Sequence, residues 1–242
     1  EVVDERLGCG VADDRAHHHA APIIGDAAAQ PFVDDFSVIL DRRAAAASAR
    51  CAGENAINAL GGTHGACSDA SLAGFVHEEY VVASFNEARH HAGRTDLVAA
   101  TTRSTGLPKA PEDILVHKGQ ARVASAQVKC RQPLRATAEL SKPEYAGQQK
   151  IVPSEQVASV RKSASLKAAK LANSDPDRAA RYRDTAKSVS DKLEVEGIES
   201  APATKADMTE LAKKARRGEA KLPKGPQPSA APALSRAAGH AF

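Results

Sequence analysis

Three polar side chains that differ in chemistry fall within the segment 111–130: the carboxylate of Asp113, the amide of Gln127 and the ammonium group of Lys129. The segment has the pattern of a β-hairpin, with an apolar run, a break at Gly119 and an alternating second run. In an antiparallel pair the start of one strand lies beside the end of the next, and residues two positions apart share a face. The spacing therefore predicts that all three side chains gather at one end of the hairpin.

This arrangement resembles the PD-(D/E)XK nuclease fold, in which an acidic residue on one strand and an E/Q-x-K sequence on the next hold a divalent metal and a catalytic lysine. Pro111-Glu112-Asp113 corresponds to the first half of that motif, and Gln127-Val128-Lys129 corresponds to the second. The resemblance implies Mg²⁺ or Mn²⁺ as cofactor, Asp113 and Gln127 as metal ligands, and Lys129 as the group that orients water or neutralises the phosphate. An ordinary hairpin with a solvated lysine is the alternative.

The segment 71–91 has the period of an amphipathic helix, and Gly93 supplies its stop. In the nuclease fold a helix before the hairpin often contributes a further acidic residue to the metal site. Glu78 and Glu79 are the candidates for that role. The alternative is that both are exposed helix carboxylates.

Parts of the chain also resemble an uncharacterised bacterial protein family. Its sequence motifs stand here as Gly74-Phe75-Val76-His77-Glu78 with Ser84-Phe85-Asn86, as Asp113 followed by Gln127-Val128-Lys129, and as Lys150-Ile151-Val152-Pro153-Ser154-Glu155-Gln156. The resemblance covers roughly residues 74–217. It favours Glu78 over Glu79 as the helix carboxylate of the metal site.

The order of the expected elements predicts a fold of the α/β (α+β) class. The helix at 71–91 is followed by a strand at 96–102, the hairpin, a helix at 134–140 and a short strand at 150–152. This order is similar to the small αβββαβ core of restriction endonucleases. The glycine-rich segment 61–65 is expected to form a turn between two short helices, because it lacks the Lys-Ser/Thr of a phosphate-binding loop.

Four regions are predicted along the chain. They are a poorly ordered leader at 1–50 with one short helix, a nuclease-like core at 51–152, a basic helical region at 153–217 and a disordered tail at 218–242. The helical region is expected to contain an αα-hairpin, whose second helix runs from Pro176 to Gly197, and a last helix capped by Thr204.

Charge is distributed unevenly along the sequence. Residues 1–130 carry 12 Lys and Arg against 17 Asp and Glu, which gives −5, whereas residues 131–242 carry 21 against 13, which gives +8. The basic half predicts nucleic acid as a partner. The chain contains no apolar run of about 18 residues and no signal-peptide pattern, and its four cysteines form no CxxC pair. These features predict a cytoplasmic protein with free thiols and no membrane partner.

Two hypotheses for the function follow. The first is a metal-dependent nuclease that hydrolyses DNA or RNA, with Glu78, Asp113 and Gln127 on Mg²⁺ and Lys129 beside them. The second is a non-catalytic module of a bacterial conflict or mobile-element system that binds nucleic acid or a protein partner. The neutral Gln127, which contributes no charge to a metal, and the lack of aromatic residues for base stacking favour the second.

Overall fold

The computed structural model describes the backbone of residues 30–107 and 110–223, with side chains from residue 37 onward. The chain divides into two compact units, residues 1–41 and 42–242. Of the first unit, the description covers only the beginning of helix α1. The leader up to residue 29 and the tail from residue 224 lie outside the described residues.

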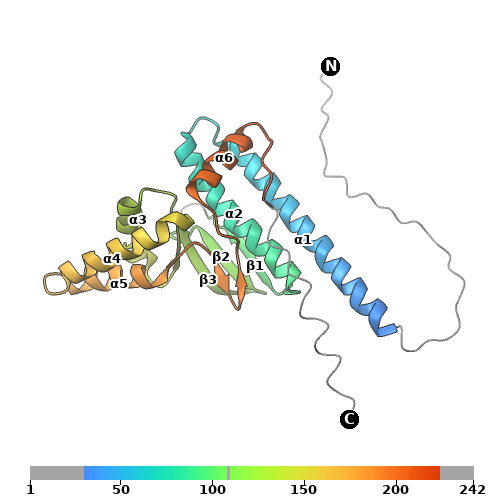
Figure 1. Cartoon of the computed structure of the whole chain (residues 1–242), viewed down its shortest axis with the longest axis horizontal. Helices are drawn as coiled ribbons and strands as arrows, with labels where there is room; N and C mark the ends of the chain where they lie inside the picture. Colours follow the sequence, from blue (N-terminus) through green and yellow to red (C-terminus); the bar gives the residue numbers. More distant parts are fainter. Residues whose placement is uncertain (1–29, 108–109, 224–242) are drawn as a thin grey trace, which may run out of the picture. The chain divides into compact units, whose positions relative to one another are not determined.

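Along the described chain, two helices precede the first three strands, and the remaining helices and strands follow in mixed order (Figure 1). In chain order the elements are α1 (Gln30–Thr63), α2 (Asp69–His91), β1 (Leu97–Thr101), β2 (Ile114–Lys118), β3 (Ala121–Val128), α3 (Pro133–Leu140), η1 (Pro143–Tyr145), β4 (Gln149–Ile151), η2 (Ser154–Gln156), α4 (Val157–Leu171), α5 (Pro176–Ser188), β5 (Val189–Ser190), β6 (Glu194–Val195), β7 (Ile198–Glu199) and α6 (Lys205–Arg216). The predicted α/β class is confirmed.

A five-stranded mixed sheet forms the centre of the fold, in the order β1-β2-β3-β4-β5. Strands β1, β2 and β3 are antiparallel neighbours, whereas β4 runs parallel to β3 and β5 runs parallel to β4. The parallel pairings require crossovers, and helix α3 lies in the first of them while α4 and α5 lie in the second. A separate two-stranded ribbon pairs β6 with β7.

Helix α2 covers one face of the sheet. Its Val81, Val82 and Phe85 form one buried apolar cluster with residues of β1, β2, β3 and β4. The predicted amphipathic helix at 71–91 is therefore confirmed, and Ser68 caps it by accepting a hydrogen bond from the backbone N–H of Ser71 at 3.3 Å. Because α2 packs both on the sheet and on the other helices, the position of Glu78 relative to the hairpin is fixed.

Helices α1, α2 and α6 share a second buried cluster, which includes Ile57, Val76 and Met208. Gly61, expected in a turn, lies instead inside α1. A Cβ atom there would come within 2.0 Å of the carbonyl oxygen of Ala215, so the absence of a side chain lets α1 and α6 touch. The turn predicted over 61–65 begins only at His64, and at Gly61 the expectation is wrong because close helix packing, not backbone freedom, explains this glycine.

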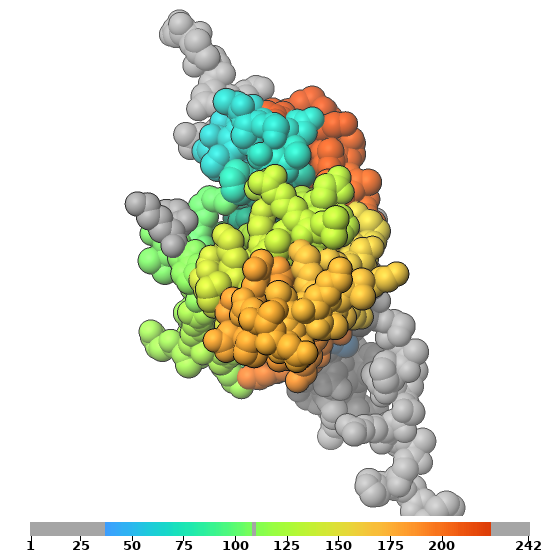
Figure 2. Space-filling model, turned by 90° about the vertical axis from the view of Figure 1, so that its left-hand side faces the viewer, coloured from blue at the N-terminus to red at the C-terminus, as the bar shows by residue number. Residues whose placement is uncertain are grey.

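The αα-hairpin of the C-terminal half consists of α4 and α5, which lie side by side (Figures 1 and 2). Its apolar contact is a small cluster of Ala164, Ala168 and Tyr182. The first helix, α4, begins at Val157 and follows directly on the 3-10 turn η2. In Figure 2 the hairpin, in gold and orange, occupies the part of the surface nearest the viewer.

The second helix of this hairpin ends earlier than the sequence predicts. It stops at Ser188 rather than continuing to Gly197, because Val189 pairs with Lys150 as strand β5 and is buried in the sheet. The backbone φ of both Glu196 (50°) and Gly197 (79°) is positive, and these residues form the two-residue turn between β6 and β7. The apolar residues between Ser188 and Gly197 have helical spacing by coincidence of burial, because the sheet and the neighbouring elements bury them in a non-helical segment.

Residues 218–223, placed in the tail by sequence, pack against α1 instead. Ala220 and Leu222 are buried. The side chain of Asn58 accepts a hydrogen bond from the N–H of Ala220 at 2.8 Å and donates one to its carbonyl at 3.2 Å. The N–H of Leu222 donates to Glu54 at 3.0 Å.

The two adjacent glycines of α1 provide a test of this helix packing. Gly61→Ala is expected to lower the free energy of unfolding by about 2–4 kcal/mol, because its methyl group must displace the backbone of α6. A Cβ at Gly62 meets nothing within 4 Å, so Gly62→Ala should be neutral or stabilise by up to about 1 kcal/mol. Urea unfolding of both variants measures the difference, and equal stabilities would contradict this packing.

Candidate functional site

The β2–β3 hairpin positions the predicted site. Its turn is at Gly119, whose φ is +59°, and a register shift separates the pairs Val116↔Ala124 and His117↔Arg122. Beyond this bulge the register ends with Ile114 opposite Ala126. Asp113 directly precedes β2, and its N–H donates to the carbonyl of Ala126 at 3.0 Å, which holds Asp113 beside the end of β3.

One carboxylate oxygen of Asp113 accepts three hydrogen bonds. The donors to Oδ2 are Nε2 of Gln127 at 2.5 Å, the backbone N–H of Val128 at 2.8 Å and Nζ of Lys129 at 3.2 Å. The structure thus brings together the three side chains that the hairpin pattern predicts at one end. Three donors, one of them charged, hold the carboxylate in a single orientation.

The amide of Gln127 is buried, with 2% of the residue exposed. Its Nε2 faces Asp113, because the amide oxygen placed there would repel the carboxylate. Its Oε1 is buried and has no hydrogen-bond partner among the described residues. A buried acceptor without a donor costs free energy, so this oxygen is available to a ligand.

Lys129 lies half-buried at the end of the same strand. Besides its ion pair with Asp113, its Nζ lies 5.7 Å from the centre of the Tyr145 ring. The ring and the carboxylate hold the ammonium group on the side of the sheet where Gln127 lies. Tyr145 comes from η1, and the sequence offers no pattern that identifies it as part of this site.

Glu78 reaches the site from α2. Its pKa is raised to about 8, first by burial and then by the negative charge of Asp113, although Arg103 and Lys129 act to lower it. Its Oε2 accepts a hydrogen bond from Arg103 at 3.1 Å. At neutral pH the carboxyl group is therefore mostly protonated in the absence of other ligands.

Arg103 is a site residue that sequence reasoning missed. It follows strand β1, its guanidinium lies 4.1 Å from the centre of the Phe75 ring, and its Nη1 is buried without a hydrogen-bond partner among the described residues. Phe75 and Glu78 are three positions apart on α2, which places both beside this one arginine. The only sequence signal for this part of the site is the Phe-x-x-Glu spacing. No sequence pattern identifies an arginine in a loop as functional.

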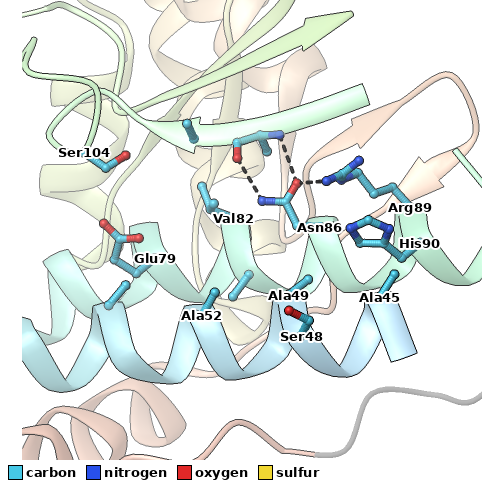
Figure 3. Close-up of a pocket in the computed structure, with 15 residues that line it drawn as sticks. Ala45, Ser48, Ala49, Ala52, Glu79, Val82, Asn86, Arg89, His90 and Ser104 are labelled. Carbon is cyan, nitrogen blue, oxygen red and sulfur yellow. Dashed lines mark hydrogen bonds between the residues drawn. The ribbon is translucent and has the colours of Figure 1, made fainter. Parts of the chain in front are cut away.

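Glu79, the other candidate carboxylate, points away from this site. Its Oε1 accepts a hydrogen bond from Thr101 at 2.8 Å, and it lines a separate cavity of about 470 Å³ between α1, α2 and β1 (Figure 3). Burial raises its pKa, and the Thr101 hydroxyl partly offsets that. Small residues such as Ala49 and Ala52 form the wall of the cavity on α1.

The site offers three oxygen atoms to a metal ion, one from each predicted ligand. Within the described part of the chain, Oε1 of Glu78, Oδ1 of Asp113 and Oε1 of Gln127 have no hydrogen-bond donor. Oxygen ligands suit Mg²⁺ and Mn²⁺. Among the same residues no three His, Cys, Asp or Glu side chains gather as a metal site. By donor type, the oxygen atoms of these three side chains suit such an ion.

The Ser84-Phe85-Asn86 motif has a structural role. The Asn86 amide donates to the carbonyl of Ala99 at 2.8 Å and accepts from its N–H at 3.0 Å, so it pairs with the outer edge of β1 (Figure 3). Ser84 Oγ accepts from the N–H of Ala201 at 3.1 Å, and Phe85 is fully buried. The motif ties α2 to the sheet.

The segment 150–156 is structural as well. Lys150 is 1% exposed, and its Nζ donates to Asp184 at 2.5 Å and to Ser188 at 3.2 Å, which joins β4 to α5. The N–H of Ser154 donates to the carbonyl of Ala203 at 2.9 Å. These contacts fix β4 beside β3 and therefore support the strand that carries Gln127.

Comparison with protein-family models, with curated proteins and with solved structures found no match to this chain. Among residues 30–107 and 110–223, no helix is long and apolar enough to cross a lipid bilayer. The geometry of the site is therefore the basis for assigning a function.

The raised pKa of Glu78 predicts a pH-dependent stability in metal-free buffer. Between about pH 4.5 and 8 the unfolded chain releases this proton and the folded chain keeps it, so the burial of Glu78 costs stability as the pH rises. Glu78→Gln removes this cost. Relative to wild type, the variant should gain roughly 2–4 kcal/mol in unfolding free energy from pH 5 to pH 9.

Urea unfolding at several pH values with a chelator measures this difference, and Glu219→Gln, which changes an exposed carboxylate, is the control. Parallel stability curves for wild type and Glu78→Gln would show that Glu78 is not buried as described.

Proposed function

We propose that this protein is a metal-dependent nuclease with a PD-(D/E)XK-like site that hydrolyses phosphodiester bonds. The observation that carries the proposal is the convergence of Glu78, Asp113, Gln127 and Lys129 at one end of the β2–β3 hairpin. The αβββαβ order from α2 to β4 supports a core like that of restriction endonucleases.

Glu78, Asp113 and the amide oxygen of Gln127 would hold Mg²⁺ or Mn²⁺. When bound, the ion would lower the pKa of a coordinated water and stabilise the charge that develops on the phosphate. Glu78 must lose its proton to serve as a ligand, so Arg103, which already lowers its pKa, assists that step.

Lys129 supplies the fixed positive charge of the site. Asp113 and Tyr145 hold its ammonium group in place, and it donates to the phosphate oxyanion or orients the attacking water. The buried, unpaired Nη1 of Arg103 is a second donor on the Glu78 side of the site. These two cations act on phosphate oxygens.

The alternative is a non-catalytic module that binds nucleic acid or a protein partner in a bacterial conflict or mobile-element system. One observation favours it: without a metal, Oδ2 of Asp113 is saturated by three donors, so Asp113 and Lys129 already neutralise each other. A hairpin end with a purely structural role would also need its carboxylate to be paired in this way.

Asp113→Ala and Lys129→Ala should each reduce nucleic-acid cleavage at least about a hundredfold, because each removes a group that acts on the reacting phosphate or its metal. The assay follows plasmid DNA, linear DNA, single-stranded DNA and RNA with Mg²⁺ or Mn²⁺, and EDTA should abolish cleavage.

Glu79→Gln is the matched control for this assay, since it alters the neighbouring carboxylate that lies outside the site and should retain cleavage. Cleavage that persists unchanged in both site variants would refute catalysis here. Wild-type protein that binds nucleic acid without cleaving it would favour the alternative.

Gln127→Glu tests the ligand set directly. A second ionised carboxylate beside Asp113 should destabilise the metal-free protein by about 1–3 kcal/mol and tighten Mn²⁺ binding by roughly tenfold, because the ion neutralises the added charge. Calorimetric titration with Mn²⁺ and thermal unfolding with and without the ion measure both effects. A variant that is destabilised and gains no affinity for Mn²⁺ would exclude Gln127 as a ligand.

A further inference from the structure

The α4–α5 hairpin carries positive charge that the protein does not neutralise. Residues 157–188 contain eight Lys and Arg against three Asp and Glu, and α4 contains no acidic residue. Of the three acids, Asp184 pairs with the buried Lys150 and Asp175 caps α5. Within the described chain, no Lys or Arg of the hairpin forms an ion pair with a carboxylate.

Cations elsewhere on the described surface do form ion pairs with carboxylates. Arg94, Lys118, Arg122, Lys192 and Arg217 each lie within 4 Å of a carboxylate. Internal pairing therefore accounts for many of the protein's surface cations but not for those of the hairpin. A charge run on a solvated helix face would show some pairs of this kind, since i, i+4 partners are common on helices.

Three lysines of α4 form one stripe on its surface, and one of them, Lys167, has its Nζ 5.4 Å from the centre of the Tyr182 ring. Lys162, Lys167 and Lys170 line a shallow hollow together with Leu166 and with Leu134 of α3. Lys162 and Lys170 are eight residues apart, which is about 12 Å along a helix. Figure 2 shows the hairpin uncovered, with the yellow-green segment that contains α3 directly beside it.

Helix α3 links this stripe to the candidate site. It begins shortly after Lys129, and its Ala136 and Leu140 are packed with Val160 of α4. The hairpin therefore has a fixed position relative to the end of β3. A long polyanion on the stripe can extend toward the site along α3, whose exposed Arg135 is paired with Glu139 of the same helix at 3.1 Å.

The described residues offer no exposed aromatic ring on which a base could stack. Tyr80, Phe85 and Tyr182 are buried, Phe75 lies under Arg103, and Tyr145 lies near Lys129. Proteins that hold single strands combine positive charge with stacking rings. A surface of lysines without rings instead suits the regularly spaced phosphates of a duplex, whose grooves are about 6 and 12 Å wide.

We propose that the α4–α5 hairpin is a binding arm for double-stranded nucleic acid, which it holds through backbone phosphates without reading sequence. The proposal deepens the nuclease function and rests on it for the role of the arm, which is to keep the duplex near the site. An acidic protein is the competing partner, because Leu134 and Leu166 are exposed within the stripe at 70% and 55%. Across residues 157–188, eight cations stand against three acids. A positive surface of this extent favours a long polyanion over a single acidic patch on a protein.

The test is binding by fluorescence anisotropy in EDTA, where no metal-dependent cleavage interferes. Wild type is titrated with a short DNA duplex, an RNA duplex, a single strand and poly-glutamate at several salt concentrations. Lys162→Ala/Lys167→Ala/Lys170→Ala should weaken duplex binding at least about tenfold and lower the slope of log affinity against log salt by about two to three.

The matched control, Lys118→Ala/Lys192→Ala/Arg217→Ala, removes the same charge from cations that are already paired and should retain most of the affinity. Preference for DNA or RNA duplex over the single strand, lost only in the hairpin variant, supports the arm and shows which duplex it takes. Three results would overturn the proposed arm. They are equal losses of affinity in the two variants, a preference for the single strand, and poly-glutamate binding as tight as duplex binding.

These results are independent of the cleavage assay. Protein that binds duplex normally in EDTA and never cleaves it refutes the nuclease function and leaves the arm. Cleavage that survives in the hairpin variant with unchanged KM refutes the arm and leaves the nuclease function.

Discussion

The candidate site depends on one irregularity in the β2–β3 ladder. Near the turn, Lys118 pairs with Ala121 and His117 with Arg122, and this register would place Asp113 opposite Ala126. Because the ladder shifts by one residue between Val116 and His117, Ile114 pairs with Ala126, and the amide of Gln127 reaches the carboxylate of Asp113 instead. A one-residue slip moves a strand's side chains to the other face, so without the bulge Gln127 and Lys129 would face away from Asp113. The three donors to Asp113 in turn stabilise this register.

The remaining elements hold this hairpin end against Glu78. Buried contacts of Phe85 and the amide pairing of Asn86 fix α2 on the sheet, while Lys150 anchors β4 through α5. The sequence motifs that surround the polar site are thus mostly scaffold. Lys150 shows why the distinction needs a structure, since a lysine in a short motif suggests chemistry and this one is buried as an ion-pair partner.

Sequence patterns predicted the helix at 71–91, the hairpin and the α/β class because each has a strong local period. They missed the end of α5 and the role of Gly61, because burial of Val189 in the sheet and contact of α1 with α6 are long-range effects. For the site, hairpin spacing placed Asp113, Gln127 and Lys129 together, although the bulge that makes this possible has no sequence signal here. Arg103 could not be predicted, since its position depends on how a loop folds over Phe75.

The pairing of Asn86 with β1 also affects how the protein meets other chains. Strand β1 is at the edge of the sheet, where free backbone groups can recruit a strand from another molecule. The Asn86 side chain occupies the N–H and C=O of Ala99, the central residue of that strand, as a neighbouring peptide would. A single amide thus fills the central hydrogen-bonding position that a strand added at this edge would need.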